Sequence, residues 1–291
     1  MGKRLNIGLF VTEFENEFTN DLCKGAIAGA KEIDANLYIF PGKYFDGVYS
    51  DEYRNRYEYQ NNTVFTYASK ENLDVLLVNM GMIGTQYNGM KQKAFFDLYR
   101  DLPIIGISSD VEGCPSVNFD NKIGIKAGIR HLINDCGCKK IGFISGPISN
   151  KDALDRLIAY KEGLLENHME YTEELVEYGF FVEDSEPFVR TLLDNNSDID
   201  GIIFANDQMA TGGYKVFEER NIKVGKDIYV MGFDNAPCSR ILEPNLTTVN
   251  ADSAELGYRA VVDCEKLMKT NADSIYIDTK LIKRLSSSIK D

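Results

Sequence analysis

The stretch Asp200-Gly-Ile-Ile-Phe-Ala-Asn-Asp207 decides the fold of this chain. Its short apolar run, residues 201–205, ends in a polar Asn-Asp pair. Helical periodicity follows over residues 208–220, and another apolar run occupies residues 229–233. Short apolar runs between turn residues predict buried strands. Strands that alternate with helices predict βαβ units and a parallel sheet, so we expect an α/β fold.

The same alternation extends over most of the chain. Further expected strands occupy residues 5–11, 37–40, 74–80, 103–108, 140–145, 174–181, 246–249 and 280–285. Further expected helices occupy residues 21–33, 95–99, 124–134, 153–167, 186–194 and 254–268. Residues 41–62 break the pattern, and we interpret them as an irregular excursion into a helix that ends near residue 72. A second, similar set of elements begins at residues 116–120, which predicts two doubly wound parallel-sheet lobes in tandem.

Charge and hydropathy exclude several classes of partner. The 291 residues carry 32 Lys and Arg against 45 Asp and Glu, a formal charge of −13. A surface of that sign repels phosphate, so we expect this chain itself to bind no nucleic acid. Its apolar runs are far shorter than the roughly 18–20 residues of a spanning helix, so we expect no membrane contact. Six scattered cysteines without C-x-x-C spacing, and no evident signal peptide, predict a cytoplasmic protein with reduced thiols.

The predicted sheets also indicate where a ligand would bind. In open parallel sheets the ligand crevice lies beyond the carboxyl ends of the strands. The segments that follow the expected strands are residues 12–18, 81–83, 108–110, 120–121, 146–156, 180–184, 206–207 and 234–235. Two lobes that face each other would enclose a cleft lined by these segments.

Several motifs resemble the effector-binding core of the lactose-repressor (LacI/GalR) family of transcriptional regulators. They are Asp200-Gly-Ile-Ile-Phe-Ala-Asn-Asp207, Asp227-Ile-Tyr-Val-Met-Gly-Phe-Asp-Asn235, Pro244-Asn-Leu-Thr-Thr-Val249, Glu255-Leu-Gly257, Lys139-Lys-Ile-Gly-Phe-Ile-Ser-Gly146 and Leu281-Ile-Lys-Arg-Leu-Ser-Ser287. The resemblance is dense from about residue 118 to the end and looser over residues 5–40.

The resemblance implies a periplasmic-binding-protein-like pair of lobes that hold a small effector between them. Three crossovers would fall near residues 118–121, 247–250 and 278–281. The N-terminal lobe would comprise residues 1–118 and 250–278, and the C-terminal lobe residues 119–249 and 279–291. Members usually dimerise, so the resemblance also implies a homodimer. It implies no cofactor.

Two features depart from the family pattern. Family repressors begin with a helix-turn-helix that reads the major groove, whereas this sequence starts at the first expected strand. We therefore expect no DNA-binding domain in the chain, and DNA contact only through a missing domain. The segment 44–72 is longer and richer in tyrosine than usual, and its run Arg56-Tyr-Glu-Tyr-Gln-Asn-Asn62 looks like a variant found in sensors fused ahead of cyclic-dinucleotide-synthesising or other signalling domains. Two interpretations stay open: the DNA-binding domain is missing from this sequence, or the sensor drives another output domain.

Four polar residues follow expected strands in the C-terminal lobe. Arg156 stands where the family places an arginine that forks onto ligand hydroxyls or a carboxylate, and the alternative is a solvated helix residue. Asp234 ends a Gly-Phe-Asp-Asn turn and could accept from two sugar hydroxyls, or only order the turn. Asn206 is a candidate of the same kind. Asp207 is interpreted chiefly as the cap of helix 208–220.

The remaining candidates are aromatic or lie at other strand ends. Phe14, Phe18 and Phe181 could stack on the apolar face of a sugar or on a base, although each could equally pack in a core. Asp120 could contact a ligand or only order its turn. Asp110 is open to the same two interpretations.

The sequence offers no catalytic or metal-binding motif. It contains no G-x-S-x-G, no G-x-x-x-x-G-K-[ST], no H-E-x-x-H, and no G-x-G-x-x-G after the first strand. Cys136-Gly-Cys138 falls in an expected helix-to-strand turn and His131 in an expected helix, so we interpret both as structural. We therefore expect no enzyme, no metal and no cofactor.

These observations favour a sensor domain whose cleft closes on a small-molecule effector. A sugar or sugar derivative fits the polar candidates best, with a nucleoside or purine next. Two alternatives stay open: a solute-binding protein of a sugar ABC transporter shares this fold, and an enzyme could be built on the same architecture.

Overall fold

The computed structural model describes residues 4–44, 57–84, 89–109, 113–269 and 272–288. Residues 45–56 of the tyrosine-rich segment and Asp110 lie outside the described residues. The chain divides into two compact units. The first comprises Met1–Phe119, Ser149–Lys151 and Asp252–Ile277, and the second comprises Asp120–Ile148, Asp152–Ala251 and Asp278–Asp291. Besides the short Ser149–Lys151 segment, the chain passes from one unit to the other after residues 119, 251 and 277.

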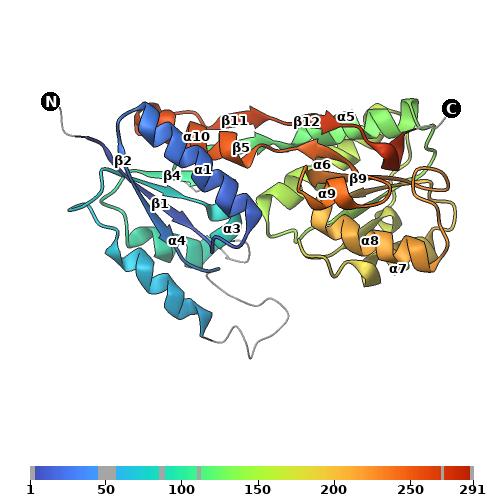
Figure 1. Ribbon diagram of the computed structural model, residues 1–291, viewed down its shortest axis with the longest axis horizontal. Coiled ribbons are helices and arrows are strands. Elements are labelled where there is room, and N and C mark those ends of the chain that lie inside the picture. Colours follow the sequence, from blue (N-terminus) through green and yellow to red (C-terminus); the bar gives the residue numbers. More distant parts are fainter. Residues whose placement is uncertain (1–3, 45–56, 85–88, 110–112, 270–271, 289–291) are drawn as a thin grey trace. The chain divides into compact units, whose positions relative to one another are not determined.

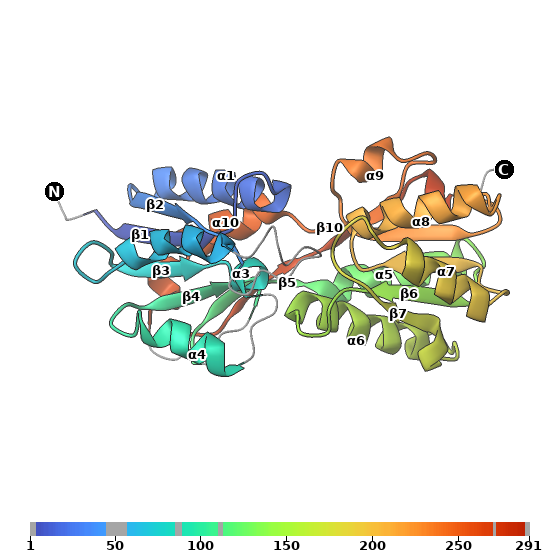
Figure 2. The same cartoon turned by 90° about the horizontal axis from the view of Figure 1, so that it is seen from below.

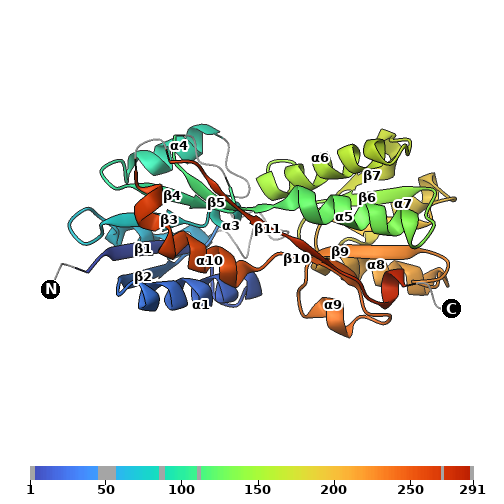
Figure 3. The same cartoon turned by 90° about the horizontal axis from the view of Figure 1, so that it is seen from above.

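The first unit is built on a six-stranded sheet of order β11-β5-β4-β3-β1-β2 (Figure 1). Its strands are β1 (Asn6–Val11), β2 (Asn36–Pro41), β3 (Val75–Val78), β4 (Ile104–Ile107), β5 (Ser116–Asp120) and β11 (Ile275–Asp278). Its helices are α1 (Glu17–Glu32), the 3-10 helix η1 (Glu58–Tyr67), α3 (Met80–Ile83), α4 (Gly89–Asp97), α10 (Ser253–Val262) and α11 (Cys264–Leu267). The pairings among β1 to β5 are parallel. Figures 2 and 3, drawn from opposite sides, show η1 and α4 over one face and α1 and α10 over the other.

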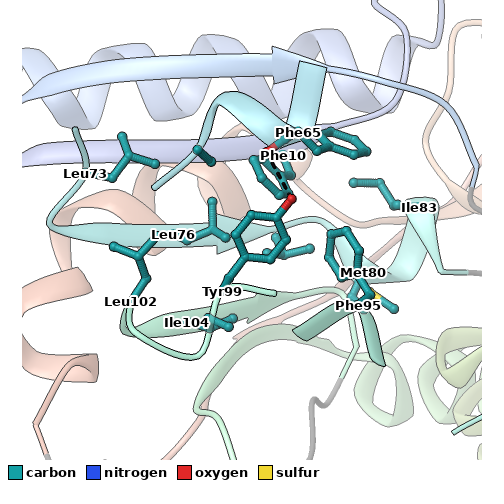
Figure 4. Packing of buried hydrophobic residues seen from close by; sticks show 12 residues of the cluster. Phe10, Phe65, Leu73, Leu76, Met80, Ile83, Phe95, Tyr99, Leu102 and Ile104 are labelled. Atoms are coloured by element: carbon teal, nitrogen blue, oxygen red, sulfur yellow. Dashed lines mark hydrogen bonds between the residues drawn. The ribbon is translucent and has the colours of Figure 1, made fainter. Parts of the chain in front are cut away.

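An aromatic core fills the face of the first sheet that η1 and α4 cover. The ring of Phe10 in β1 stacks on Phe65 of η1 at a centroid distance of 4.4 Å and meets Tyr99 edge-on at 5.3 Å. The Tyr99 hydroxyl donates a hydrogen bond of 2.9 Å to the Phe65 carbonyl (Figure 4). Burial in this cluster raises the pKa of Tyr99 to about 12. The described part of the tyrosine-rich segment thus contributes Phe65 and Ala68 to the buried core of the first unit.

Helices α1 and α10 approach each other so closely that glycine is required at their contact. A Cβ atom on Gly25 would lie 1.7 Å from the carbonyl oxygen of Ala254, and one on Gly257 would lie 2.0 Å from that of Leu22. Protein interiors are close-packed and leave no room for such an atom without movement of the backbone. The two helices lie side by side in Figure 3. This contact joins the first helix of the chain to a segment that returns from the second unit.

The second unit repeats the strand order of the first, as β12-β10-β9-β8-β6-β7. Its strands are β6 (Ile141–Ser145), β7 (Val176–Tyr178), β8 (Gly201–Phe204), β9 (Tyr229–Asp234), β10 (Thr247–Asn250) and β12 (Lys280–Ile282). Its helices are α5 (Asn121–Asn134), α6 (Lys151–Glu166), α7 (Glu186–Asn195), α8 (Asp207–Glu219) and α9 (Cys238–Ile241), with the 3-10 helices η2 (Glu173–Leu175) and η3 (Leu285–Ser287). The β12–β10 pairing is antiparallel and the others are parallel.

Helices cover both faces of the second sheet, as the continuous apolar strands predicted. Along β6, Gly142 faces Leu192 of α7, whereas the next residue, Phe143, stacks on Tyr160 of α6 at 4.9 Å. Along β9, a Cβ on Gly232 would meet Asp207 at the start of α8. Successive residues of a strand point to opposite faces, so β6 is buried on both faces. The predicted fold class, two doubly wound parallel-sheet lobes joined by three crossovers, is confirmed.

Some expected elements differ from the observed ones near the C-terminus. The helix expected over 254–268 is two helices: α10 ends at Val262 with Asp263 as its C-cap, and the Asp263 carboxylate pairs with Arg259 at 2.6 Å. The strand expected over 280–285 is shorter, and the sequence analysis missed β11 before it. Strand β11 alternates half-buried and exposed residues and carries little apolar signal. The strand expected over 174–181 is limited to β7, which η2 precedes.

Candidate ligand-binding site

Arg156 of α6 ties together three elements of the second unit. Its guanidinium donates from Nε to Asn121 Oδ1 at 2.9 Å and from Nη1 to the Ala205 carbonyl at 2.7 Å, while Nη2 lies 3.5 Å from Asp234 Oδ1. Its Cζ atom lies 3.7 Å from the centroid of the Phe233 ring. Only 4% of the residue is exposed, and a cation buried this far requires such partners. The alternative of a solvated helix arginine is therefore wrong.

Asn121 and Asp152 extend the Arg156 cluster. Asn121 begins α5 and donates from Nδ2 to Asp152 Oδ1 at 2.7 Å. Asp152 precedes Arg156 by one helical turn, so both side chains lie on the same side of α6. Asn121 accordingly accepts from the arginine and donates to the aspartate, which fixes the orientation of both.

Asp234 ends β9 in an unusual backbone conformation. Its φ is 104°, and that of the following Asn235 is 58°, a region that L-residues other than Asn and Asp rarely enter. Burial raises the pKa of the Asp234 carboxyl to about 6; the Arg156 guanidinium opposes this rise and the Asp152 carboxylate adds to it. About a third of the side-chain surface still reaches solvent. The residue therefore combines a partner cation, an accessible carboxylate and a titration near neutral pH.

Asn206, and not the expected Asp207, caps helix α8. Asn206 precedes α8, and its Oδ1 accepts from the Met209 backbone N–H at 2.9 Å, so Asn206 is the N-cap and Asp207 is the first helical residue. Asp207 is fully buried and accepts from Thr248 Oγ1 at 2.6 Å and from the Ala236 N–H at 2.8 Å. Burial, and then the nearby Asp234 carboxylate, raise its pKa well above the usual range. The expectation that Asp207 caps the helix is wrong.

Phe181 and Asp120 also belong to the second unit. The Phe181 ring centroid lies 5.9 Å from the Arg156 guanidinium carbon, and the ring leaves no room for a side chain at Gly146. Asp120 is the N-cap of α5, and its Oδ1 accepts from the N–H groups of Lys122 and Ile123. Phe181 thus borders the arginine, and Asp120 orders the turn that presents Asn121.

Phe14 and Phe18 lie in the first unit, in the segment between β1 and α1 and in α1 itself. Phe14 is 45% exposed. Phe18 is half-buried, and its ring meets Phe119 at a centroid distance of 6.4 Å. Within the described residues, no ring contact joins Phe14 to Phe18. Each therefore remains a separate candidate for ring stacking.

Two buried polar side chains stand at neighbouring strand ends of the first unit. Asn79 follows β3 and is fully buried, and neither its Oδ1 nor its Nδ2 has a hydrogen-bond partner among the residues that the structure describes. Ser108 follows β4 with φ of 55° and is 3% exposed, and its Oγ likewise has no partner within the described ranges. Buried polar groups without partners are rare in native proteins and call for a ligand or water.

Only part of the candidate site was therefore predicted from the sequence. The second unit brings Arg156, Asp234 and Phe181 together beside the Asn206 cap. It also brings in Asn121 and Asp152, which were not among the candidates. The one-turn spacing of Asp152 and Arg156 was the available signal. Asn79 was missed because the strand expected over 74–80 ends at Val78, which leaves the asparagine at the edge of the sheet.

The structural interpretation of His131 and the Cys136-Gly-Cys138 segment agrees with their contacts. His131 is 6% exposed and lies within hydrogen-bond distance of Asp135 through Nδ1 and of Ser287 through Nε2. The Cys136 thiol donates to the Ser287 carbonyl, and burial raises the pKa of that thiol to about 11. Both residues thus anchor η3 to α5.

Among the described residues, no cluster of His, Cys, Asp and Glu could hold a metal ion, and no helix is long and apolar enough to cross a bilayer.

Comparison with known proteins identifies relatives of both units. Residues 129–287, more than half of the chain, match the periplasmic binding protein-like domain. The transcriptional regulator CelR of Thermobifida fusca is 33% identical over 174 residues, 58% of this chain and 51% of that protein. The ribose operon repressor of Halalkalibacterium halodurans is 31% identical over 158 residues, 54% of this chain and 47% of that protein. The chain spans about half the length of these relatives.

Solved structures share the fold over nearly the whole chain. A CelR–cellobiose complex superposes with a TM-score of 0.79 at 24% identity, covering 98% of this chain and 85% of the other. A lac repressor dimer bound to operator superposes with a TM-score of 0.78 at 21% identity, covering 99% and 95%. The chain therefore belongs to the periplasmic binding protein-like family, and its two lobes are those of a LacI/GalR-type effector-binding domain.

Proposed function

We propose that the chain is the sensor part of a LacI/GalR-type transcriptional regulator and binds a sugar or sugar derivative. The observation that carries the proposal is the Arg156–Asp234 pair, a buried guanidinium fork beside a partly accessible carboxylate at the carboxyl edge of a parallel sheet. Sugar hydroxyls donate to a carboxylate and accept from a guanidinium, so this pair can bind both sides of a vicinal diol. Phe181 next to Arg156 supplies an apolar face for the ring.

Asn79 and Ser108 support the same ligand chemistry in the first unit. Their buried amide and hydroxyl lack partners among the described residues, and each unsatisfied group costs about 1–3 kcal/mol. A ligand rich in hydroxyls would satisfy all of them. We propose that the ligand favours one of two states of the protein, to the extent that its affinities for those states differ.

The named relatives favour a regulator over the two alternatives. CelR is an HTH-type transcriptional regulator, and the second relative is a ribose operon repressor. We propose that this chain works in the same way as a cytoplasmic homodimer and that DNA is bound through a separate domain.

The test is a binding screen with the sugars that the relatives' names suggest. We expect D-ribose, cellobiose or a close derivative to bind in isothermal titration calorimetry, and nucleosides and sugar phosphates to bind more weakly. A ligand at 100 times its Kd should stabilise the protein by about 2.7 kcal/mol. Asp234→Asn should weaken binding at least about tenfold, because the amide offers one acceptor in place of two.

The matched control is Asp194→Asn, which removes a surface carboxylate paired with Arg220 in the same unit. It should leave binding unchanged. A sugar that binds wild type and Asp234→Asn equally well would show that the assigned site is wrong.

A further inference from the structure

Arg284, in the C-terminal motif Leu281-Ile-Lys-Arg-Leu-Ser-Ser287, contacts the turn that carries Asp234 without contacting Asp234 itself. From Nη2 it donates to Asn235 Oδ1 at 2.5 Å. From Nη1 it donates to the Leu246 carbonyl at 2.8 Å and to Ser239 Oγ at 3.0 Å. Nη1 thus binds the segment before β10, whereas Nη2 binds Asn235, the residue next to the proposed ligand-binding carboxylate.

Asn235 depends on this contact because its backbone is in the left-handed region. Asp234 and Asn235 both have positive φ, and such strained pairs persist only where the surroundings hold them. The Asn235 side chain donates from Nδ2 to Asn250 Oδ1 at 2.8 Å, and its N–H donates to Thr248 Oγ1 at 3.2 Å. With Arg284 on Oδ1, both ends of the Asn235 amide are held. Among the hydrogen bonds of Asn235 within the described ranges, that with Arg284 comes from outside β9 and β10.

We propose that Arg284 is a positioning residue that acts through Asn235 to hold the Asp234 carboxylate beside Arg156 in the orientation that receives the ligand. The proposal rests on the proposed function for its meaning, but its geometry can be tested without a ligand. Planarity matters here: the guanidinium fork reaches Asn235, Leu246 and Ser239 at once, whereas a lysine ammonium is a single point with a flexible stem.

The test follows the titration of Asp234 by carboxyl NMR in protein labelled with ¹³C-aspartate. The signal is assigned by its loss in Asp234→Asn. The informative variant is Asn235→Gly, because glycine tolerates the positive φ and Arg284 keeps its bonds to Leu246 and Ser239. Arg284→Lys and Arg284→Gln complete the set. The control is Lys283→Gln, which removes the neighbouring charge, paired with Asp135, from the same segment.

The direction of the shift separates positioning from a simple charge effect. If Arg284 positions the turn, its loss lets the carboxylate become hydrated, and the midpoint falls by about one unit toward the value of a free aspartate. Asn235→Gly and Arg284→Lys, which both keep a cation at 284, should then lower the midpoint as Arg284→Gln does. Lys283→Gln should leave it unchanged. If Arg284 acts only as a charge, Arg284→Gln raises the midpoint and the other two variants do nothing, which would overturn the proposal.

A second measurement uses the sugar that binds wild type in the screen. Asn235→Gly and Arg284→Lys should each weaken its binding about tenfold, with Lys283→Gln as the unchanged control. If no sugar in the screen binds wild type, the proposed function fails, yet the titration still decides whether Arg284 positions Asp234. A lowered midpoint with undiminished sugar affinity would show that Arg284 orders the turn but not the ligand, and would overturn the proposal.

Discussion

Arg156 and Asp234 show how far single residues could be predicted. A strand-end position and a suitable side-chain chemistry singled them out, and the structure brings them to 3.5 Å of each other. Their neighbours could not be predicted in the same way. The Ala205 carbonyl is a backbone atom with no sequence signature, and Asn121 reaches Arg156 only because α5 and α6 pack side by side. Buried polar clusters are assembled by tertiary contacts, which residue spacing does not record.

The raised pKa of Asp234 predicts a stability that depends on pH. The folded protein binds this proton more tightly than the unfolded chain, so the free energy of unfolding falls as pH rises from about 4 to about 6 and is level above that. One unit of pKa corresponds to about 1.4 kcal/mol. Because a third of the side chain is exposed, solvent screening lowers the total, and we expect about 1 kcal/mol.

Asp234→Asn should remove this dependence. At pH 7 the variant should be about 1 kcal/mol more stable than wild type, and the difference should vanish below pH 4, in urea unfolding followed from pH 3 to pH 8. The control, Asp194→Asn, removes a carboxylate whose pKa is lowered by Arg220, so its effect has the opposite sign. A variant that is less stable than wild type at pH 7 would contradict the prediction.

Elements were predictable where burial made them uniform. Strands β3, β4 and β8 are buried along their whole length, and a continuous apolar run with turn residues at both ends was enough to predict them. Strand β11 lies at the edge of its sheet and half exposed, so its residues carry no such run. The break between α10 and α11 depends on one Asp263 in an otherwise periodic stretch. Exposed and locally capped elements therefore escape patterns that detect burial.

The close contact between α1 and α10 predicts unequal effects of the same substitution at two glycines. Alanine is favoured over glycine by about 1 kcal/mol inside a helix. At Gly25 this gain is outweighed, because the new Cβ would lie 1.7 Å from the Ala254 carbonyl oxygen. At Gly29 the nearest atom, the Tyr258 carbonyl oxygen, is 3.0 Å away, and a small shift accommodates the methyl group.

We therefore expect Gly25→Ala to lower the free energy of unfolding by at least about 2 kcal/mol and Gly29→Ala to change it by less than about 1 kcal/mol. Urea unfolding of both variants at pH 7 measures the difference. Equal effects at the two positions would show that α1 and α10 are free to move apart, contrary to the packing described here.

The whole chain contains two sheets with the same strand order, and this repetition places polar residues at equivalent edges. Asn79 and Ser108 follow β3 and β4 in the first unit, while in the second Asn206 follows β8 and Asp234 ends β9. In each unit these strands lie next to each other on one side of the point where the strand order reverses. That is the region where open α/β sheets bind ligands, so each unit by itself presents a comparable candidate site.

If sugar binding depends on both candidate sites, a substitution in either unit should abolish the same conformational response. Asn79→Leu is suited to the first unit, because it replaces a buried amide without described partners by an apolar group of similar size and should not destabilise the fold. Its matched control is Asn196→Leu, since the amide of Asn196 donates to the carbonyls of Glu174 and Leu192 and its loss should cost stability but not affinity.

Small-angle X-ray scattering with and without the sugar measures the response. Wild type and Asn196→Leu should contract on addition of the sugar, because a ligand shifts the population toward the state that it binds more tightly. Asn79→Leu and Asp234→Asn should both bind more weakly and fail to contract at the same sugar concentration. Contraction that survives Asn79→Leu but not Asp234→Asn would place the ligand in the second unit alone, and the two unsatisfied groups of the first unit would then be satisfied by water.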